Sequence, residues 1–203
     1  KVKKKVAMRI DGNNHISPLS DFLSLGEWNH KVLVCCGHKP LAISIATCVA
    51  LEGSGGTEHL LGVCTTAHDS LEILKTVQDS VLVLISEVLD DSNGVELLEQ
   101  IQKQAKPDQS IRTILTLEVL NKNVLKNAAL CRPNVLLSQR GFQPAVIRHA
   151  LEAIVNNTAY VDPLILHILA GQTPSDVPDL SEREVEVLIL VCEGLTNREI
   201  GRR

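Results

Sequence analysis

The chain has 203 residues, of which 44% are hydrophobic, 22% charged and only 2% aromatic. These proportions lie near globular averages, and no apolar run reaches membrane-spanning length, so we expect neither a disordered chain nor a membrane protein. The formal net charge of −4 gives no overall basic surface for duplex nucleic acid. The length suffices for one substantial, aliphatic core and a smaller unit.

Residues 1–28 form an N-terminal extension that precedes the first predicted strand. Near its end lie four large apolar residues, Phe22, Leu23, Leu25 and Trp28. Their clustering over residues 17–28 predicts a short helix that docks on the domain or on a partner subunit.

Short aliphatic runs then alternate with helical patterns up to residue 158. We expect strands over residues 32–35, 59–64, 81–86, 112–117 and 135–137. We expect helices over residues 40–51, after a cap at 69–72, from the turn at 90–94 through 104, near 119–130, and from Pro144 onward. Each crossover is long enough for a right-handed βαβ unit. The pattern therefore predicts an α/β fold with a flavodoxin-like, doubly wound, five-stranded parallel sheet in the order 2-1-3-4-5.

The chain contains six cysteines with no CxxC pair, and no secretory signal precedes them. Reduced thiols in a cytoplasmic protein are therefore expected. The adjacent Cys35 and Cys36, with His38 nearby, offer a redox or metal pair as an alternative. Neighbours on a strand point to opposite faces, which weakens joint ligation. We therefore predict that the cysteines are reduced and pack in the core, and we expect no metal and no cofactor.

Two helix start signals occur near the end of the sequence, at residues 181–184 and 196–199. In each, a hydroxyl can accept from the N3 amide while a glutamate reaches back to the cap amide. Gly194 between them suits the left-handed position that ends the first helix. A helix, a tight turn and a second helix form the geometry of helix-turn-helix DNA-binding proteins.

Residues 180–203 strongly resemble the start of the LuxR/NarL (FixJ-type) DNA-binding domain. The matching positions are Leu180, Arg183, Glu184, Val187, Leu188, Gly194, Asn197, Glu199 and Ile200. The resemblance implies a partial helix-turn-helix domain, because Arg203 lies within the second helix and the family's recognition helix comes after it. It also implies that Thr196, Asn197 and Arg198 contact the DNA backbone, which positions the protein without specifying sequence.

Residues 29–158, placed before such a segment, resemble the receiver domain of a bacterial response regulator. Residues 81–94 match the family's third strand and the loop after it, in which the phosphoacceptor aspartate lies eight residues before the glycine. That position is Ser86 here. The resemblance also places the family's switch hydroxyl at Thr116.

The other receiver positions are substituted as well. The family's acidic pair falls on Cys36 and Gly37, or on Gly37 and His38 if the register slips, and its lysine falls on Ser138. Transfer of a phosphoryl group to a receiver needs a carboxylate nucleophile, a hard cation held by oxygen ligands and a compensating positive charge. We therefore expect an atypical receiver, a pseudo-receiver, that works without phosphorylation.

Three neighbouring groups need separate interpretations. Glu87 comes after Ser86 on the strand and should face the opposite side, which argues against a built-in phosphate mimic. Asp90 and Asp91 are interpreted as solvated turn residues. For Thr116, a backbone hydrogen bond and a retained switch role both remain open.

Residues 159–179 are interpreted as a linker. Residues 160–163 and a helix over 164–169 are similar to the interdomain segment of NarL-type regulators. Pro174 and Pro178 restrict the flexibility of the linker, so the receiver-like domain could set the orientation of the DNA-binding domain.

These patterns together predict a cytoplasmic transcriptional regulator and not an enzyme. Its receiver-like domain would mediate dimerisation or take input from a protein partner, and its LuxR-type domain would bind DNA as a homodimer, away from any membrane. Two alternatives remain. One is a protein-interaction adaptor that does not read DNA, and the other is a redox sensor working through Cys35 and Cys36.

Overall fold

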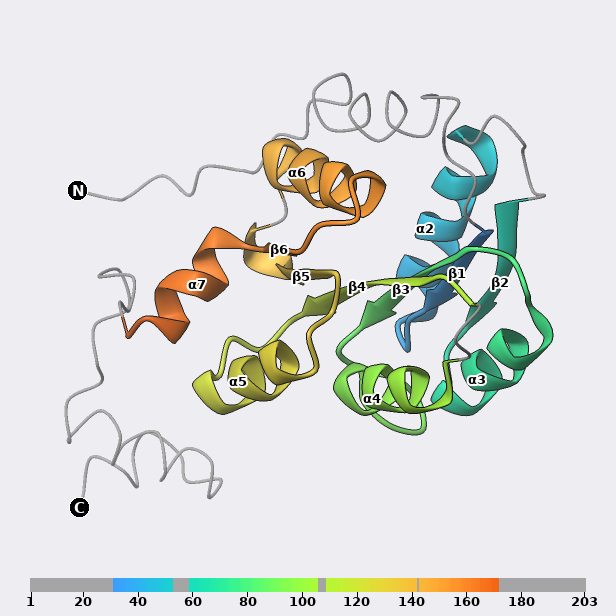
Figure 1. The fold of residues 1–203 in the computed structure, drawn as a ribbon, viewed down its shortest axis with the longest axis horizontal. Coiled ribbons are helices and arrows are strands. Elements are labelled where there is room, and N and C mark those ends of the chain that lie inside the picture. Colours follow the sequence, from blue (N-terminus) through green and yellow to red (C-terminus); the bar gives the residue numbers. More distant parts are fainter. Residues whose placement is uncertain (1–30, 53–58, 106–108, 142, 172–203) are drawn as a thin grey trace, which may run out of the picture. The chain divides into compact units, whose positions relative to one another are not determined.

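The computed structural model describes residues 31–52, 59–105, 109–141 and 143–171 (Figure 1). They contain a parallel sheet of six strands in the order β2-β1-β3-β4-β5-β6. The strands are β1 (Lys31–Cys35), β2 (Leu60–Cys64), β3 (Val81–Ser86), β4 (Ile111–Leu117), β5 (Val135–Ser138) and β6 (Tyr160–Val161). The order of the first five confirms the predicted flavodoxin-like, doubly wound sheet.

The sheet has one strand more than the five predicted. The Tyr160 amide donates to the Asn134 carbonyl and the Asp162 amide to the Leu136 carbonyl, both at 2.9 Å, so β6 extends the sheet beside β5. A two-residue strand is too short to show an alternating pattern, and its residues were therefore expected in the linker. The compact unit that holds the sheet continues past residue 158 to Ala170.

Six α-helices pack around the sheet. They are α2 (Lys39–Glu52), α3 (Ala67–Thr76), α4 (Gly94–Gln104), α5 (Lys122–Leu130), α6 (Pro144–Val155) and α7 (Pro163–Leu169). Helices α3, α4 and α5 cover one face, together with Ile165 of α7, while α2 and α6 cover the other (Figure 1). None of the helices in the described part of the chain is both long and apolar enough to cross a membrane.

The aliphatic runs of the sequence become strands that are buried on both faces. In β1, Leu33 and Cys35 point toward α3 and α4, whereas Val32 and Val34 point toward α2. A strand covered by helices on both sides needs apolar side chains at every position, and each one contributes roughly 1.5–3 kcal/mol on full burial. This is why these strands read as continuous apolar runs in the sequence.

Two helix starts differ from the sequence prediction. Helix α3 begins earlier than the predicted cap at Asp69, because the Thr66 hydroxyl accepts the Asp69 amide at 3.1 Å and caps the helix. Helix α5 begins at Lys122 after the cap Asn121, later than the predicted start near residue 119. The expected start of α6 at Pro144 is confirmed.

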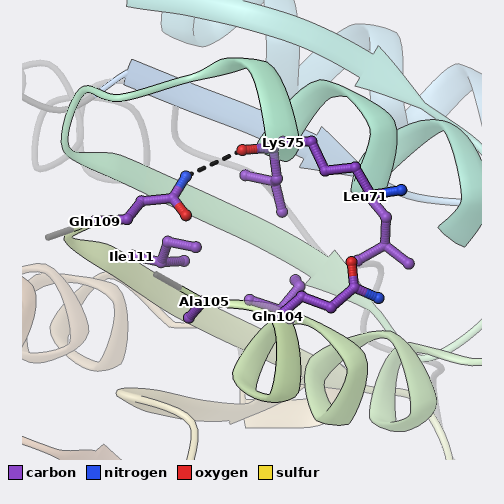
Figure 2. A pocket seen from close by; sticks show the side chains of 8 residues that line it. Leu71, Lys75, Gln104, Ala105, Gln109 and Ile111 are labelled. Carbon is purple, nitrogen blue, oxygen red and sulfur yellow. Dashed lines mark hydrogen bonds between the residues drawn. The ribbon is translucent and has the colours of Figure 1, made fainter. Parts of the chain in front are cut away.

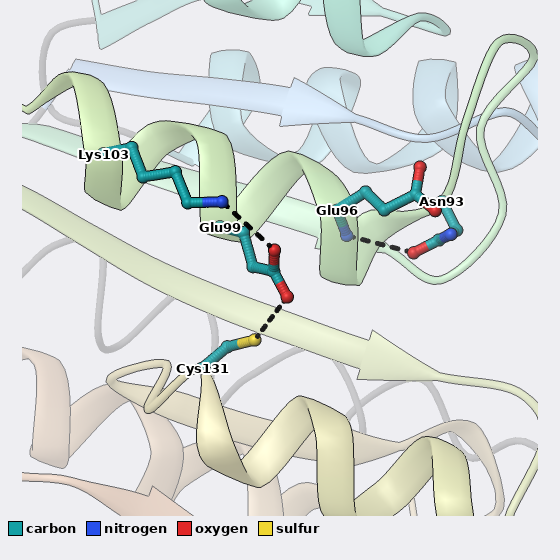
Figure 3. A network of polar contacts seen from close by, with 5 residues as sticks. All are labelled: Asn93, Glu96, Glu99, Lys103 and Cys131. Atoms are coloured by element: carbon teal, nitrogen blue, oxygen red, sulfur yellow. Dashed lines mark hydrogen bonds and ion pairs between the residues drawn. The ribbon is translucent and has the colours of Figure 1, made fainter.

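Polar contacts connect α4 with the end of α5 (Figure 3). The side-chain Oδ1 atom of Asn93 accepts the Val95 and Glu96 amides and caps α4. Farther along this helix, Glu99 pairs with Lys103 at 3.5 Å and accepts the Cys131 thiol at 3.6 Å. Burial, and then the nearby Glu99 charge, raise the pKa of Cys131, so this thiol stays protonated and serves as a hydrogen-bond donor.

Three sequence predictions lie wholly or partly outside the described residues. These are the short helix over residues 17–28, the linker beyond residue 171 with Pro174 and Pro178, and the helix-turn-helix segment over 180–203, which includes Thr196, Asn197 and Arg198.

Candidate functional site

The carboxyl ends of the central strands bring the predicted receiver positions to one edge of the sheet. Ser86 at the end of β3 pairs with Thr116 in β4, and Ser138 at the end of β5 pairs with Leu117. Cys36 and Gly37 come directly after β1, which lies beside β3. In doubly wound sheets this edge is where ligands bind. The structure thus brings together five residues that are far apart in the sequence.

Backbone atoms close the place where a receiver would present its acidic pair. The Val88 carbonyl accepts the Ser86 hydroxyl at 2.9 Å and the Gly37 amide at 3.0 Å. A Cβ atom on Gly37 would lie 2.8 Å from the same carbonyl oxygen, which is too close for an ordinary contact. Position 37 therefore has no room for an aspartate or glutamate unless the β3–α4 loop moves.

Cys35 and Cys36 are both buried and point to opposite faces of the sheet, as the sequence predicted. Burial raises the pKa of Cys35 to about 12, so its thiol is protonated at neutral pH and is a poor nucleophile. The described residues include no cluster of three or more His, Cys, Asp or Glu side chains that could hold a metal ion. This geometry disfavours a redox or metal role for the cysteine pair.

The Glu87 carboxylate connects the loop after β3 to the loop after β4. Its Oε2 atom accepts the Glu118 amide at 2.6 Å and the Val119 amide at 2.9 Å. The Glu87 amide in turn donates to the Thr116 carbonyl at 2.9 Å. The loop after β4 is therefore held by the carboxylate of Glu87, the residue that directly follows β3. The contact joins residues more than thirty positions apart, so the local sequence pattern gave no sign of it.

Ser138, at the position of the receiver lysine, belongs to a buried hydrogen-bond network. The Asp162 Oδ2 atom accepts the Ser138 amide at 3.0 Å and its hydroxyl at 2.7 Å. Oδ1 of the same carboxylate accepts the Leu164 amide at 2.8 Å and caps α7. Ser138 thus connects β5 to α7, and sequence reasoning did not identify Asp162 as its partner.

Asp91 has a structural role beyond that of a solvated turn residue. Its carboxylate accepts the Ala67 amide at 2.7 Å and the His68 amide at 3.1 Å, which are the first two amides of α3. The hydrogen bond from Ala67 is the main reason that the pKa of Asp91 lies below its ordinary value. The loop after β3 is thereby attached to the start of α3.

We expect Asp91→Ala to lower the free energy of unfolding by about 1 kcal/mol at neutral pH, because two helix-start amides lose their acceptor. The folded-state pKa is lowered, so this stabilisation is present above the unfolded-state pKa of about 3.9 and is lost as pH falls through the folded-state value. Urea unfolding across pH should show the difference from wild type shrinking below about pH 4. Asp90→Ala is the matched control and should change stability by less than about 0.5 kcal/mol at every pH.

Two hollows flank the central strands. One, of about 280 Å³, lies at the carboxyl ends of β1 and β3, and its lining includes Leu41, Leu84, Ser86 and Thr116. The other, of about 300 Å³, lies between α3, the end of α4 and the start of β4 (Figure 2). In this second hollow Gln109 donates to the Leu74 and Val77 carbonyls at 3.0 Å and so caps the end of α3. Gln109 therefore has a structural role in this hollow.

The topology of the sheet defines a receiver-like fold. Comparison with known proteins gives the same class. No protein-family model matches the chain. By sequence it is 22% identical over 174 residues to the response regulator protein VraR of Staphylococcus saprophyticus, across 84% of this chain and 79% of that protein.

Solved structures show the same fold. A structure of two RcsB dimers bound to two parallel DNAs matches with a TM-score of 0.57 and 17% identity, covering 86% of this chain and 82% of that chain. A LuxR-family two-component response regulator from Aurantimonas sp. SI85-9A1 matches with a TM-score of 0.55 and 13% identity, covering 70% and 95%. The chain is thus similar in sequence to a protein named as a response regulator, and similar in fold to a structure named as a LuxR-family response regulator.

Proposed function

We propose that this chain is a cytoplasmic transcriptional regulator whose receiver-like domain works without phosphorylation. The proposal is carried by the residues that occupy the receiver positions. Ser86 replaces the phosphoacceptor carboxylate, and its hydroxyl is already donated to the Val88 carbonyl. A serine at this position cannot form the acyl phosphate on which receiver signalling depends.

The residues around Ser86 support the same conclusion. Cys36 and Gly37 supply no carboxylate for a magnesium ion, and the approach of the Val88 carbonyl leaves no space for one at position 37. Ser138 supplies no positive charge and is engaged with Asp162. Regulation would then come through dimerisation or a protein partner, and the DNA-binding segment over residues 180–203 would carry the output. The DNA complex of the similar RcsB dimers supports this output.

A phosphorylation assay tests the regulatory half of the proposal. We expect incubation with acetyl phosphate and Mg²⁺ to leave the intact mass unchanged, and beryllofluoride with Mg²⁺ to leave the oligomeric state unchanged. A phosphorylatable response regulator treated in parallel shows that the reagents are active. A phosphoryl adduct on residues 31–171, or dimerisation driven by beryllofluoride, would contradict the proposal.

A DNA-binding assay tests the output half and separates it from the adaptor alternative. Duplex DNA should be bound with an affinity that falls steeply between about 50 and 200 mM salt. Arg198→Ala should weaken binding to all sequences alike and reduce the salt slope by about one, because the proposed contact is to a phosphate. When the protein assayed carries the family's recognition helix after residue 203, binding of duplex DNA at neither salt concentration would favour the adaptor without DNA reading.

A further inference from the structure

The hollow beside Ser86 lies at the point where the strand order of the sheet reverses. From β1 the chain passes through α2 to β2 on one side, and then crosses through α3 to β3 on the other side of β1. Helices α2 and α3 consequently cover opposite faces of the sheet. Beyond the paired ends of β1 and β3 the chain continues into α2 on one face and into α4 on the other, and such switch points are the usual ligand sites of doubly wound sheets.

The lining of this hollow is uncharged. It includes Val34, Leu41, Ile45 and Leu84, and the part of the chain that the structure describes places no Asp, Glu, Lys, Arg or His side chain in it. An ionised ligand would lose its hydration without gaining an opposite charge, whereas a neutral apolar one gains by leaving water. The lining chemistry therefore selects against ions, phosphate among them.

Polar groups are few and sit at the strand ends. The hydroxyl of Ser86 and the thiol of Cys36 donate to backbone carbonyls at 2.9 Å and 3.6 Å. Thr116 adds a hydroxyl to the same lining, and Gln139 adds an amide. A few polar groups in a mainly apolar wall are typical of small-molecule sites, where they orient one polar group of the ligand.

The mouth of the hollow is also apolar. Leu41 of α2 is 38% exposed at its rim, and Ile43 on the same helix is 62% exposed. The hydroxyls of Ser44 and Thr47 donate to the Pro40 and Ile43 carbonyls of their own helix, at 2.9 Å and 2.8 Å. Residues 41–47 of α2 therefore add no charge to the mouth, and the exposed charge at the start of this helix is that of Lys39.

We propose that the hollow at the carboxyl ends of β1 and β3 binds a small, uncharged, mainly apolar molecule that carries one hydrogen-bonding group. Its volume of about 280 Å³ is close to the lower limit of known small-molecule sites. Binding stands on the hollow alone, and only its use as the regulatory input rests on the proposed function. If the ligand does not bind, the proposed function still stands, and if the proposed function fails, the binding site still stands.

Cyclohexanol and cyclohexanecarboxylate make a matched pair of probes with the same ring and different charge. With the full chain labelled at its methyl groups, NMR should show saturable shifts of the Val34, Leu41 and Leu84 methyls on addition of cyclohexanol. The carboxylate should bind at least about tenfold more weakly, because its charge finds no partner in the lining. Shifts that rise without saturation, or equal binding of both probes, would overturn the proposal.

Two variants of α2 localise the site. Leu41→Glu places a charge at the rim of the hollow and should weaken cyclohexanol binding about tenfold or more. Ile43→Glu places the same charge on the same helix outside the lining and should leave binding within about twofold of wild type. Both side chains are exposed, so both variants should fold, and their methyl spectra report this directly. Equal binding by the two variants would show that the probe lies elsewhere.

Discussion

Gly94→Ala is expected to destabilise the receiver-like unit by about 3 kcal/mol or more. Gly94 is the first residue of α4, which begins against the end of β3. A Cβ atom there would lie 2.2 Å from the Ser86 carbonyl oxygen and 3.0 Å from a Leu115 methyl group. Backbone on one side and a buried side chain on the other leave the methyl group nowhere to move. Urea unfolding followed by circular dichroism measures the loss.

Gly62→Ala is the matched control for this prediction. Its Cβ atom would meet only side chains, the nearest being the Ile73 Cδ1 atom at 3.2 Å, and that side chain can shift. The change in the free energy of unfolding should stay within about 1 kcal/mol. Equal stability of the Gly94→Ala variant and the wild type would show that α4 does not begin against β3 in solution.

The arrangement of the sheet results from patterns that are local in the sequence. Continuous apolar runs such as residues 81–86 indicate strands buried on both faces, and helical patterns between them require crossovers. Right-handed crossovers then leave few possible strand orders. This is why the order of β1 to β5 was predicted, whereas Ser86, Thr116 and Ser138 were assigned from the resemblance to a receiver domain.

The contacts that hold this edge together were not predictable in the same way. Glu87 binds amides in the β4–α5 loop, Asp91 binds the start of α3, and Asp162 binds Ser138. Each is a carboxylate that accepts backbone amides from a distant segment, and local patterns carry no information on such pairs. The same limitation explains β6, whose two residues are defined only by their pairing with β5.

These carboxylates stabilise the loops at this edge of the sheet. Two of the acids near this edge accept backbone amides. Glu87 holds the loop after β4, and Asp91 holds the start of α3. Carboxylates that accept several amides can order loops without an ion or a phosphate. In the structure, the loops after β3 and β4 are therefore tied to neighbouring segments by the protein's own carboxylates.

Asp162→Ala is the second variant with a large expected effect, a loss of about 3 kcal/mol in the free energy of unfolding. Asp162 is only 2% exposed, and Ser138 is fully buried. Removing the carboxylate leaves the Ser138 amide and hydroxyl without their acceptor and removes the cap of α7. Buried donors that lose a charged acceptor are among the costlier defects in a protein.

The matched variant is Ser138→Ala, which removes the hydroxyl that donates to Asp162 and accepts the Gly141 amide, and which keeps the cap of α7. It should cost about 1 kcal/mol, and the double variant should cost less than the sum of the two single ones, because both act on one hydrogen bond. Hydrogen exchange separates a local from a global effect. We expect Asp162→Ala to speed amide exchange in β6 and α7 before the central strands, since α7 depends on this carboxylate for its first turn. Strict additivity, or unchanged exchange in α7, would mean that Asp162 does not couple the Ser138 position to the helix.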